Sequence, residues 1–291
     1  MKDSYLMRFA FPLFLLIALT YATHSSGATE IQRPGEALGF APHKALYAVK
    51  LQSAKSGSQI INIDGHMYYD WTYECGAWSS KHRFNVLYEY ADSPAMRISS
   101  DFSNYEDYNG STLNYSTIRY QDGKQYENVR GHATAFADKK GEAIYNEPPG
   151  LTQTLPVGTL YPMAHTIKVL NAAKDGQKFL NATVFDGSDE DGPVEINAFI
   201  GKQIERADIM DQIKDNKALD ETLIDGNARQ IQLAFFPLNK QQDLADYEMS
   251  LTLHDNSVIS DMVIDYSDFS VSQTLVAIEP VDPTETTKAC Q

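Results

Sequence analysis

The segment Ile60–Tyr90 reads IINIDGHMYYDWTYECGAWSSKHRFNVLYEY. It contains both tryptophans of the chain, Trp71 and Trp78, and one of its two cysteines, Cys75. Aromatic residues that alternate with polar ones and are interrupted by glycine are typical of strands in a twisted antiparallel sheet. A tight corner at Cys75-Gly76 divides the segment. We therefore expect it to form neighbouring strands of one sheet.

The same alternation continues on both sides of this segment. Residues 45–51 place Tyr47, Val49 and Leu51 on one face, and Asp122-Gly123 is a typical hairpin turn. About a dozen strands with short connections follow from such patterns. A sheet of this length must curl, close or stack to protect its edges. The pattern thus predicts a mostly β fold, as a wide curved sheet or a spiralled open barrel.

One segment changes to a helical period. The spacing predicts a single helix over 162–174, with a proline at its first turn, a stop at Asp175-Gly176, and apolar residues at Met163, Ile167 and Leu170. Residues 146–155, rich in proline and glycine, are expected to be a connection. Residues 206–227 are polar and weakly helical, and we interpret them as a surface excursion.

The N-terminal residues indicate export. Phe9–Ala22 is an apolar run too short to span a bilayer, and small residues up to Ala28 suit a signal peptidase. We expect cleavage after Ala28, with Ala22 as the second choice. A transmembrane anchor is the alternative, weakened by Pro12 and by the length of the run. The predicted organisation is a signal peptide over residues 1–28 and a single domain over residues 29–291.

The net charge of −15 excludes some classes of partner. An acidic surface argues against nucleic-acid binding and against electrostatic attachment to anionic lipid. It does not identify a partner, because net charge mainly governs solubility.

Two cysteines, Cys75 and Cys290, most often form one disulfide in an exported chain. Two free thiols or a bridge between chains are the alternatives. A zinc site needs more ligands than two cysteines so placed.

Motifs of catalysis are absent from the sequence: there is no nucleophile elbow, zinc-protease helix, phosphate loop or dinucleotide fingerprint. The histidines are scattered without metal-ligand spacing. The acidic group Asp186, Asp189, Glu190 and Asp191 could hold calcium, but it lacks the spacing of an EF-hand loop, which favours a solvated turn. The sequence predicts no catalytic residue, no cofactor and no metal.

Four residues are candidates for either the core or a ligand surface: Trp71, Trp78, Tyr69 and His165. The tryptophans could line a concave surface for an apolar or sugar ligand, although we favour a place in the core. His165 lies one position off the apolar stripe of the predicted helix. It is more typical of an imidazole at the core edge than of a catalytic base.

Several fragments resemble the EipB family of periplasmic cell-envelope integrity proteins, also described as the domain of unknown function DUF1849. They occur in the order of the family across nearly the whole chain after the leader, at Pro42 to Tyr47, Gly65 to Trp71, Cys75 to Trp78, Arg130 to Ala133, Tyr161 to His165, Val184 to Ser188, and Ile200-Gly201.

The resemblance implies an almost closed antiparallel β-spiral plugged by a helix, an architecture similar to the lipoprotein-handling proteins LolA and LolB. It implies a disulfide, which here falls on Cys75 and Cys290, and a periplasmic role without known catalysis. The acidic excursion at 206–227 is bulkier than in the family, so a partner surface could differ there.

Three functions compete. The first is a non-catalytic periplasmic protein that maintains the envelope by holding a lipoprotein, a lipopeptide or another apolar ligand, or a protein partner, in the spiral cavity. The second is a structural scaffold whose interior is filled by its own side chains. The third, least favoured, is a hydrolase, which would need a nucleophile beside a base.

Overall fold

The computed structural model describes residues 39–213, 216–224, 226–238 and 244–282. Fourteen strands within these ranges form one sheet in which every neighbouring pair is antiparallel. Along the chain they are β1 (His43–Ala54), β2 (Ile60–Glu74), β3 (Ala77–Tyr90), β4 (Met96–Asp107), β5 (Thr112–Gln121), β6 (Lys124–Thr134), β7 (Gly141–Glu147), β8 (Thr152–Leu155), β9 (Phe179–Val184), β10 (Val194–Ile204), β11 (Ala228–Pro237), β12 (Tyr247–His254), β13 (Ile259–Asp265) and β14 (Phe269–Pro280).

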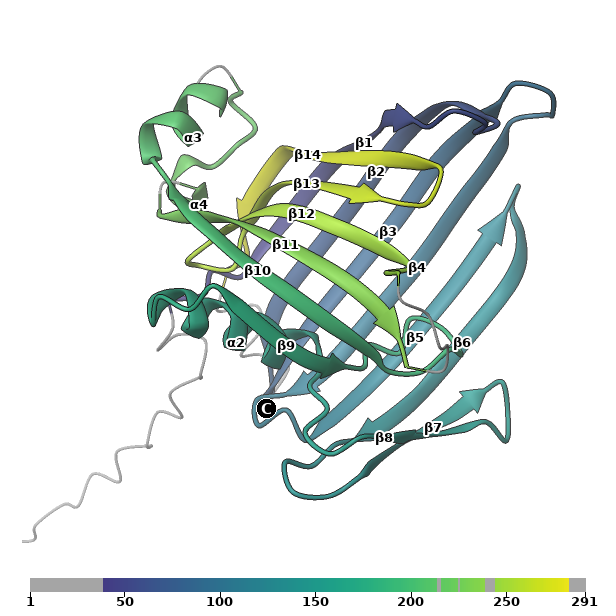
Figure 1. Ribbon diagram of the computed structural model, residues 1–291, viewed down its shortest axis with the longest axis vertical. Coiled ribbons are helices and arrows are strands. Elements are labelled where there is room, and N and C mark those ends of the chain that lie inside the picture. Colours follow the sequence, from purple (N-terminus) through teal and green to yellow (C-terminus); the bar gives the residue numbers. More distant parts are fainter. Residues whose placement is uncertain (1–38, 214–215, 225, 239–243, 283–291) are drawn as a thin grey trace, which may run out of the picture. The chain divides into compact units, whose positions relative to one another are not determined.

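The order of the strands in the sheet is β8-β7-β6-β5-β4-β3-β2-β1-β14-β13-β12-β11-β10-β9. The first and last strands therefore pair in the middle of the sheet, with His43 opposite Pro280. The two edge strands, β8 and β9, come from the middle of the chain, and only one helical segment separates them in the sequence. Figure 1 shows this long meander (blue to teal, then green to yellow).

The sheet curls until its two edges approach each other, but no strand ladder joins them. Leu160, which follows β8, forms a bridge to β9 instead: its N–H donates to the Thr183 carbonyl oxygen at 2.9 Å. In return, its carbonyl oxygen accepts the N–H of Phe185 at 3.0 Å. The predicted mostly β, curled and open sheet is confirmed.

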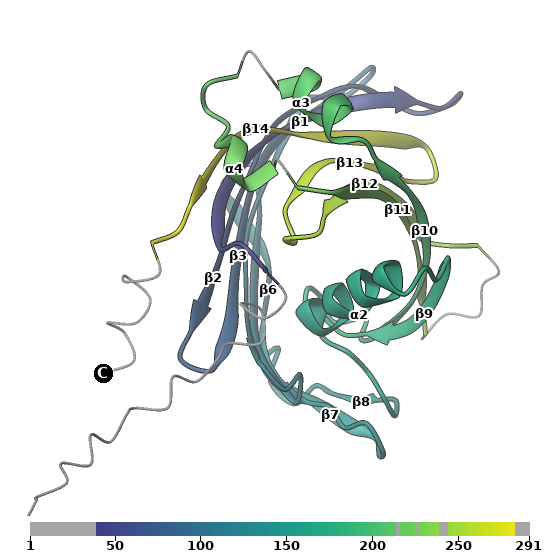
Figure 2. The ribbon, with the colours of Figure 1, turned by 90° about the vertical axis from the view of Figure 1, so that its left-hand side faces the viewer.

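The helix α2 (Pro162–Lys174) lies in the concave side of this sheet, between β9 and the wall formed by β1 to β6 (Figure 2). Its bounds are those that the sequence predicts. Pro162 suits the first turn because its missing N–H would have no helical partner there. Gly176, at a φ of +75°, accommodates the left-handed turn that ends the helix.

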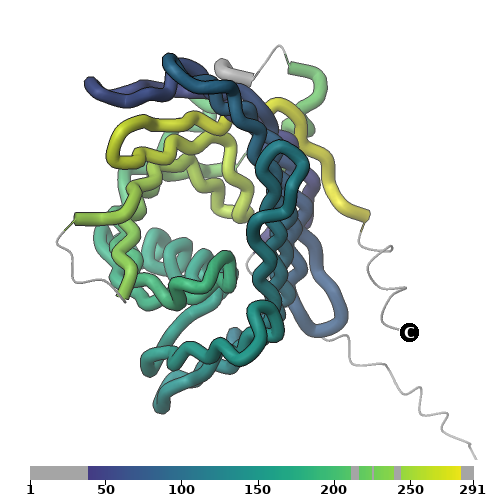
Figure 3. Tube along the Cα trace, turned by 90° about the vertical axis from the view of Figure 1, so that its right-hand side faces the viewer, coloured from purple at the N-terminus to yellow at the C-terminus, as the bar shows by residue number. Residues whose placement is uncertain are grey.

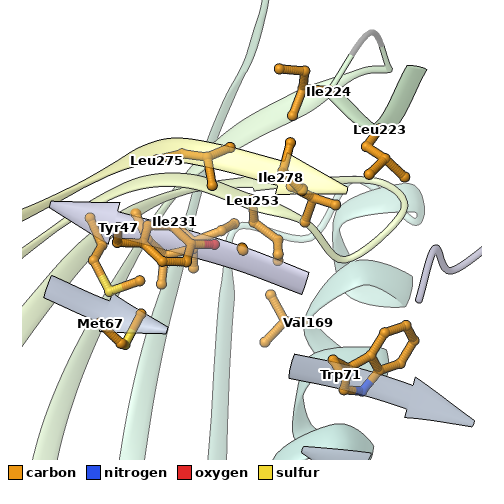
Figure 4. Close-up of a cluster of buried hydrophobic side chains, with 14 of the residues drawn as sticks. Tyr47, Met67, Trp71, Val169, Leu223, Ile224, Ile231, Leu253, Leu275 and Ile278 are labelled. Carbon is orange, nitrogen blue, oxygen red and sulfur yellow. The ribbon is translucent and has the colours of Figure 1, made fainter. Parts of the chain in front are cut away.

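The main core lies between α2 and the inner face of the sheet. Trp71 and Trp78 stack at 5.6 Å between ring centroids, and Phe40 packs against both at 6.1 Å. Val169 of α2 belongs to the same cluster as Met67 on β2 and Leu253 on β12 (Figure 4). In Figure 3 the green and yellow strands curve around α2 opposite the blue and teal strands. One core thus connects both halves of the meander through the helix.

Two details of the predicted fold are wrong. Helices α3 (Arg206–Ile213) and α4 (Glu221–Ile224) accompany α2 in the described chain, where one helix was expected. The interpretation of 206–227 as a surface excursion also fails in part, because Leu223 and Ile224 are buried in the core against β14. Helix α4 is only four residues long, and two adjacent apolar residues are too few to show a helical period.

The expected connection at 146–155 is the second correction. It contains the edge strand β8, which pairs with β7 from Gly141 opposite Leu155. This strand is only four residues long, and proline and glycine directly before it hide its pattern.

No described helix has the length and apolar character that a membrane crossing requires.

Candidate functional site

An apolar cavity of about 220 Å³ lies between α2 and the inner face of the sheet. It is lined by residues of both halves of the meander and of the helix: Tyr47, Met67, Tyr69, His82, Met163, His165, Thr166, Val169, Ile231, Leu233, Met249, Leu251, Leu253, Ser257, Ile259 and Met262. Strand alternation explains this lining. On β12 every second residue, from Met249 to Leu253, lines the cavity.

Methionine is prominent in the apolar cavity. Four of the eight methionines of the chain line it, two from strands of the second half of the sheet, one from β2 and one from α2: Met249, Met262, Met67 and Met163. Methionine is unbranched and polarizable, so it adapts to ligands of irregular shape and recurs at surfaces that accept several partners. A lining of this kind suits a flexible apolar chain.

His165 is the most buried polar side chain in this cavity, with 7% exposed. Its Nε2 atom has no hydrogen-bond partner in the structure. Burial, together with the nearby charge of Lys168, lowers the pKa of His165 to about 4. The imidazole is therefore neutral above about pH 5, and its Nε2 atom is buried without a partner in the wall of the cavity.

Two tyrosines of the lining are also uncharged. Tyr47 donates its hydroxyl proton to the carbonyl oxygen of Ile259 at 2.7 Å, and this bond ties β1 to β13 over the intervening strand β14. Burial raises the pKa of Tyr47 and that of Tyr69 far above the ordinary value. The apolar cavity thus contains no fixed charge.

A second cavity, of about 240 Å³, adjoins the first at the N-terminal end of α2. The two linings have in common Tyr69, His82, Met163 and Thr166. The second lining is more polar and also contains Trp78, Ser80, Phe102, Asn104, Glu106, Pro162 and Asp186. We call the first the apolar cavity and the second the polar cavity.

Glu106 on β4 joins the polar cavity to the helix. It is 2% exposed, and its two carboxylate oxygens accept the backbone N–H groups of Met163 and Ala164, each at 2.8 Å. The N–H groups of the first helical turn have no partner within the helix, and the side chain of the N-cap residue Tyr161 forms no hydrogen bond with them. The carboxylate of Glu106 therefore caps the helix in its place. Burial nevertheless raises the pKa of Glu106 to about 7, against the effect of these two hydrogen bonds.

Asn104, two residues earlier on the same face of β4, is 5% exposed. Neither its Nδ2 nor its Oδ1 atom has a hydrogen-bond partner in the structure. Ser80 lies opposite Asn104 on β3, and Trp78 lies opposite Glu106. A buried amide that is unsatisfied at both atoms costs about 1–3 kcal/mol for each, which a bound polar group could recover.

The four residues singled out in the sequence separate into different places. Trp71 is 1% exposed and lies in the core, outside both linings. Trp78 is as buried but touches the polar cavity, whereas His165 lines the apolar one and Tyr69 lines both.

Sequence reasoning missed Asn104, Glu106 and the methionines. The available signal was the alternation of Phe102, Asn104 and Glu106 within a predicted strand. It placed polar groups on the face that other strands fill with aromatic side chains.

Cys75 lies at the turn between β2 and β3, where Gly76 adopts a φ of +85°. Cys290 lies outside the described residues, so the disulfide between them stays a prediction. The described tail ends near the part of β2 that leads to Cys75, because Pro280 pairs with His43, which pairs with Trp71. Ten residues can span about 33 Å, enough to cross two strand spacings of about 4.8 Å and reach Cys75.

In the acidic turn after β9, the carboxylates accept hydrogen bonds from backbone N–H groups of the same turn. Asp186 accepts the N–H of Ser188 at 2.9 Å, and Asp189 accepts the N–H of Asp191 at 2.8 Å. In the part of the chain that the structure describes, no three His, Cys, Asp or Glu side chains form a group suited to a metal ion. Thr166, the hydroxyl nearest to His165 in sequence, donates to the Pro162 carbonyl oxygen rather than to an imidazole.

A curled, open antiparallel sheet with a helix in its hollow and an apolar cavity beneath that helix defines a barrel-like class of β proteins with a sheltered interior. The chain belongs to the EipB-like family, whose sequence pattern matches residues 34–282.

One relative is the cell envelope integrity protein EipB of Brucella abortus (strain 2308), 27% identical over 285 residues, which cover 92% of this chain and 97% of that protein. Among solved structures, the beta-barrel-like protein of the domain of unknown function DUF1849 from Brucella abortus is similar, with a TM-score of 0.73 and 25% identity. The match covers 84% of this chain and 99% of that one.

Proposed function

We propose that this chain is a non-catalytic periplasmic protein that maintains the cell envelope by holding an apolar part of a ligand, such as the acyl chain of a lipoprotein or lipopeptide, in the apolar cavity. The name of the Brucella abortus relative supports the envelope role. The membership of the chain in a family named after that protein supports it further.

The observation that carries the proposal is the lining of the apolar cavity. Its walls are aliphatic side chains, methionines and uncharged rings, and Val169 of α2 forms part of its floor at 3% exposure. Transfer of apolar surface from water into such a site is favourable by about 25 cal/mol per Å². An acyl chain gains most from this term, because it has no polar group to desolvate.

Helix α2 is suited to regulate access. It connects the two edge strands, and it closes the cavity with one face while its N-terminus is held by Glu106. The edges on either side of it are joined by the Leu160 bridge rather than by a continuous ladder. A small outward movement of the helix would enlarge the cavity without breaking strand pairs.

Binding of the fluorescent apolar dye N-phenyl-1-naphthylamine tests the proposal. We expect the purified mature chain to enhance the fluorescence of the dye, and lauroyl compounds or a synthetic diacylated lipopeptide to displace it. Absence of dye binding, together with absence of binding to every acyl compound by calorimetry, would contradict the proposal.

A matched pair of variants locates the binding. Val169→Phe adds volume inside the apolar cavity and should weaken dye binding by about tenfold or more, at a cost of about 1–3 kcal/mol in folding free energy. Asn171→Leu, on the exposed side of the same helix, should change neither the dye affinity nor the folding free energy. Equal affinity in both variants would place the dye elsewhere.

A structural scaffold is the second candidate. The stacked pair Trp71 and Trp78, with Phe40, packs tightly in the interior near Cys75. A scaffold of this kind would bind no dye, and Val169→Phe would then alter only its stability.

A further inference from the structure

The two adjoining cavities differ in polarity, and this difference specifies the ligand beyond its apolar chain. The apolar cavity has space for the chain, while the polar cavity begins where the chain would end, at Tyr69 and His82. A ligand that occupied both would place its head group beside Ser80, Asn104 and Glu106. The charges and free hydrogen-bonding atoms of the polar cavity therefore decide which head group fits.

We infer that the polar cavity selects a neutral head group that both donates and accepts hydrogen bonds, such as an amide or a glycerol, and rejects a free carboxylate or phosphate. This inference rests on the proposed function, since it concerns the head group of the same ligand.

The first observation behind it is the unsatisfied amide of Asn104. Its Nδ2 needs an acceptor and its Oδ1 needs a donor, and the side chain is buried in the wall of the polar cavity. An amide or a hydroxyl supplies both kinds of group at once. A carboxylate supplies acceptors only, so the Oδ1 atom of Asn104 would stay unsatisfied.

The second observation is the charge of the two linings. Among the described residues that line either cavity, none is lysine or arginine, whereas Glu106 and Asp186 are carboxylic acids. An anionic head group would lose its hydration and meet no compensating cation, which is strongly unfavourable. His82 does not supply a cation either, because burial lowers its pKa to about 4.

The position of Glu106 strengthens this argument. Both of its oxygens already accept the N–H groups of Met163 and Ala164, so the helix N-terminus is occupied by a carboxylate from the protein itself. A second anion cannot use the same donors. The positive end of the helix, which often binds phosphate, is therefore closed to a phosphate of the ligand.

The experiment compares three amphiphiles with the same lauroyl chain: lauramide, 1-monolauroylglycerol and laurate. Each competes with N-phenyl-1-naphthylamine for the mature chain at pH 8, where laurate is ionised. We expect the two neutral compounds to bind at least about tenfold more tightly than laurate. Equal or tighter binding of laurate would overturn the inference while the proposed function stands. If none of the three displaces bound dye, and none binds by calorimetry, the proposed function fails and the inference with it.

The variant Asn104→Leu tests the role of the amide itself. Because it removes two unsatisfied polar atoms from a buried position, we expect it to fold with at least the wild-type stability. The affinity for lauramide, measured relative to that for the dye, should fall by about tenfold. Asn114→Leu, the same substitution at an exposed position of the neighbouring strand β5, should leave this ratio unchanged. A destabilised Asn104→Leu variant with an unchanged ratio would show that Asn104 is structural, and the inference would be wrong.

Discussion

The carboxylate of Glu106 on β4 accepts the backbone N–H of Met163 in the first turn of α2, at 2.8 Å. This contact connects the wall of the sheet to the helix that closes the cavity, across the whole segment from β5 to β8. Because the carboxyl is buried, its protonation state affects both the stability of the fold and the hold on the helix.

The first prediction concerns the pH dependence of this contact. The folded pKa of Glu106 is raised to about 7 from 4.5, so the folded state binds more protons than the unfolded state between these values. The stabilising contribution of protonation is present below pH 4.5 and is lost as the pH rises to about 7, by an amount on the order of 3 kcal/mol. Glu106→Gln should remove this dependence.

Urea unfolding of both proteins at several values between pH 4.5 and 8 measures the effect. The difference in unfolding free energy between wild type and Glu106→Gln should shift in favour of the variant as the pH rises. The exposed substitution Glu142→Gln is the matched control. Parallel curves for wild type and Glu106→Gln would contradict the prediction.

The second prediction concerns acid. Burial lowers the pKa of His165 to about 4 from 6.5, so the unfolded state binds more protons between these values. Stability is therefore lost as the pH falls from 6.5 to 4, by up to about 3 kcal/mol from this residue. His165→Gln should lose less stability than wild type between pH 7 and pH 4.5, and His66→Gln at an exposed position serves for comparison. An equal loss in wild type and His165→Gln would refute this role for burial.

The third prediction concerns the stacked tryptophans. Trp71 is 1% exposed and contacts Trp78, Phe40 and Tyr73. Trp71→Ala should cost about 3–5 kcal/mol of unfolding free energy, while Trp71→Phe should cost clearly less. Chemical denaturation followed by circular dichroism measures both. A loss below 1 kcal/mol for the alanine variant would mean that this cluster is not a main part of the core.

The fourth prediction follows from the proposed disulfide between Cys75 and Cys290. Under oxidising conditions Cys75→Ser should lower the unfolding free energy by about 2–5 kcal/mol, because the bridge restricts the unfolded chain. Cys290→Ser should have the same effect, and the double variant should be no worse than either. Additive losses, or two thiols that react with a thiol reagent in the unreduced folded protein, would exclude the bridge.

Local features of the fold could be predicted from the sequence, because local rules determine them. The helix at 162–174 follows from its apolar spacing and from Pro162 and Gly176 at its ends. The β5–β6 hairpin follows from Asp122-Gly123, which supplies the two residues of positive φ that the turn needs.

The arrangement of the sheet could not be predicted in this way. The pairing of β1 with β14 joins the two ends of the described chain, and no local pattern specifies it. The cavity depends on that pairing, because Tyr47 on β1 reaches Ile259 on β13 only when β14 lies between the two strands. Without the pairing, the sequence could not show that the polar face of β4 turns inward, and so Asn104 and Glu106 looked like ordinary strand residues.

The central claim is that the interior holds an apolar ligand in the cell. Native mass spectrometry tests it most directly on the full chain, expressed in a bacterial host with a periplasm and released without detergent. We predict a non-covalent adduct that carries an acyl chain, present on the wild type and lost in Val169→Phe. Wild-type protein that appears only at the mass of its polypeptide, identical in this respect to Val169→Phe, would contradict the account.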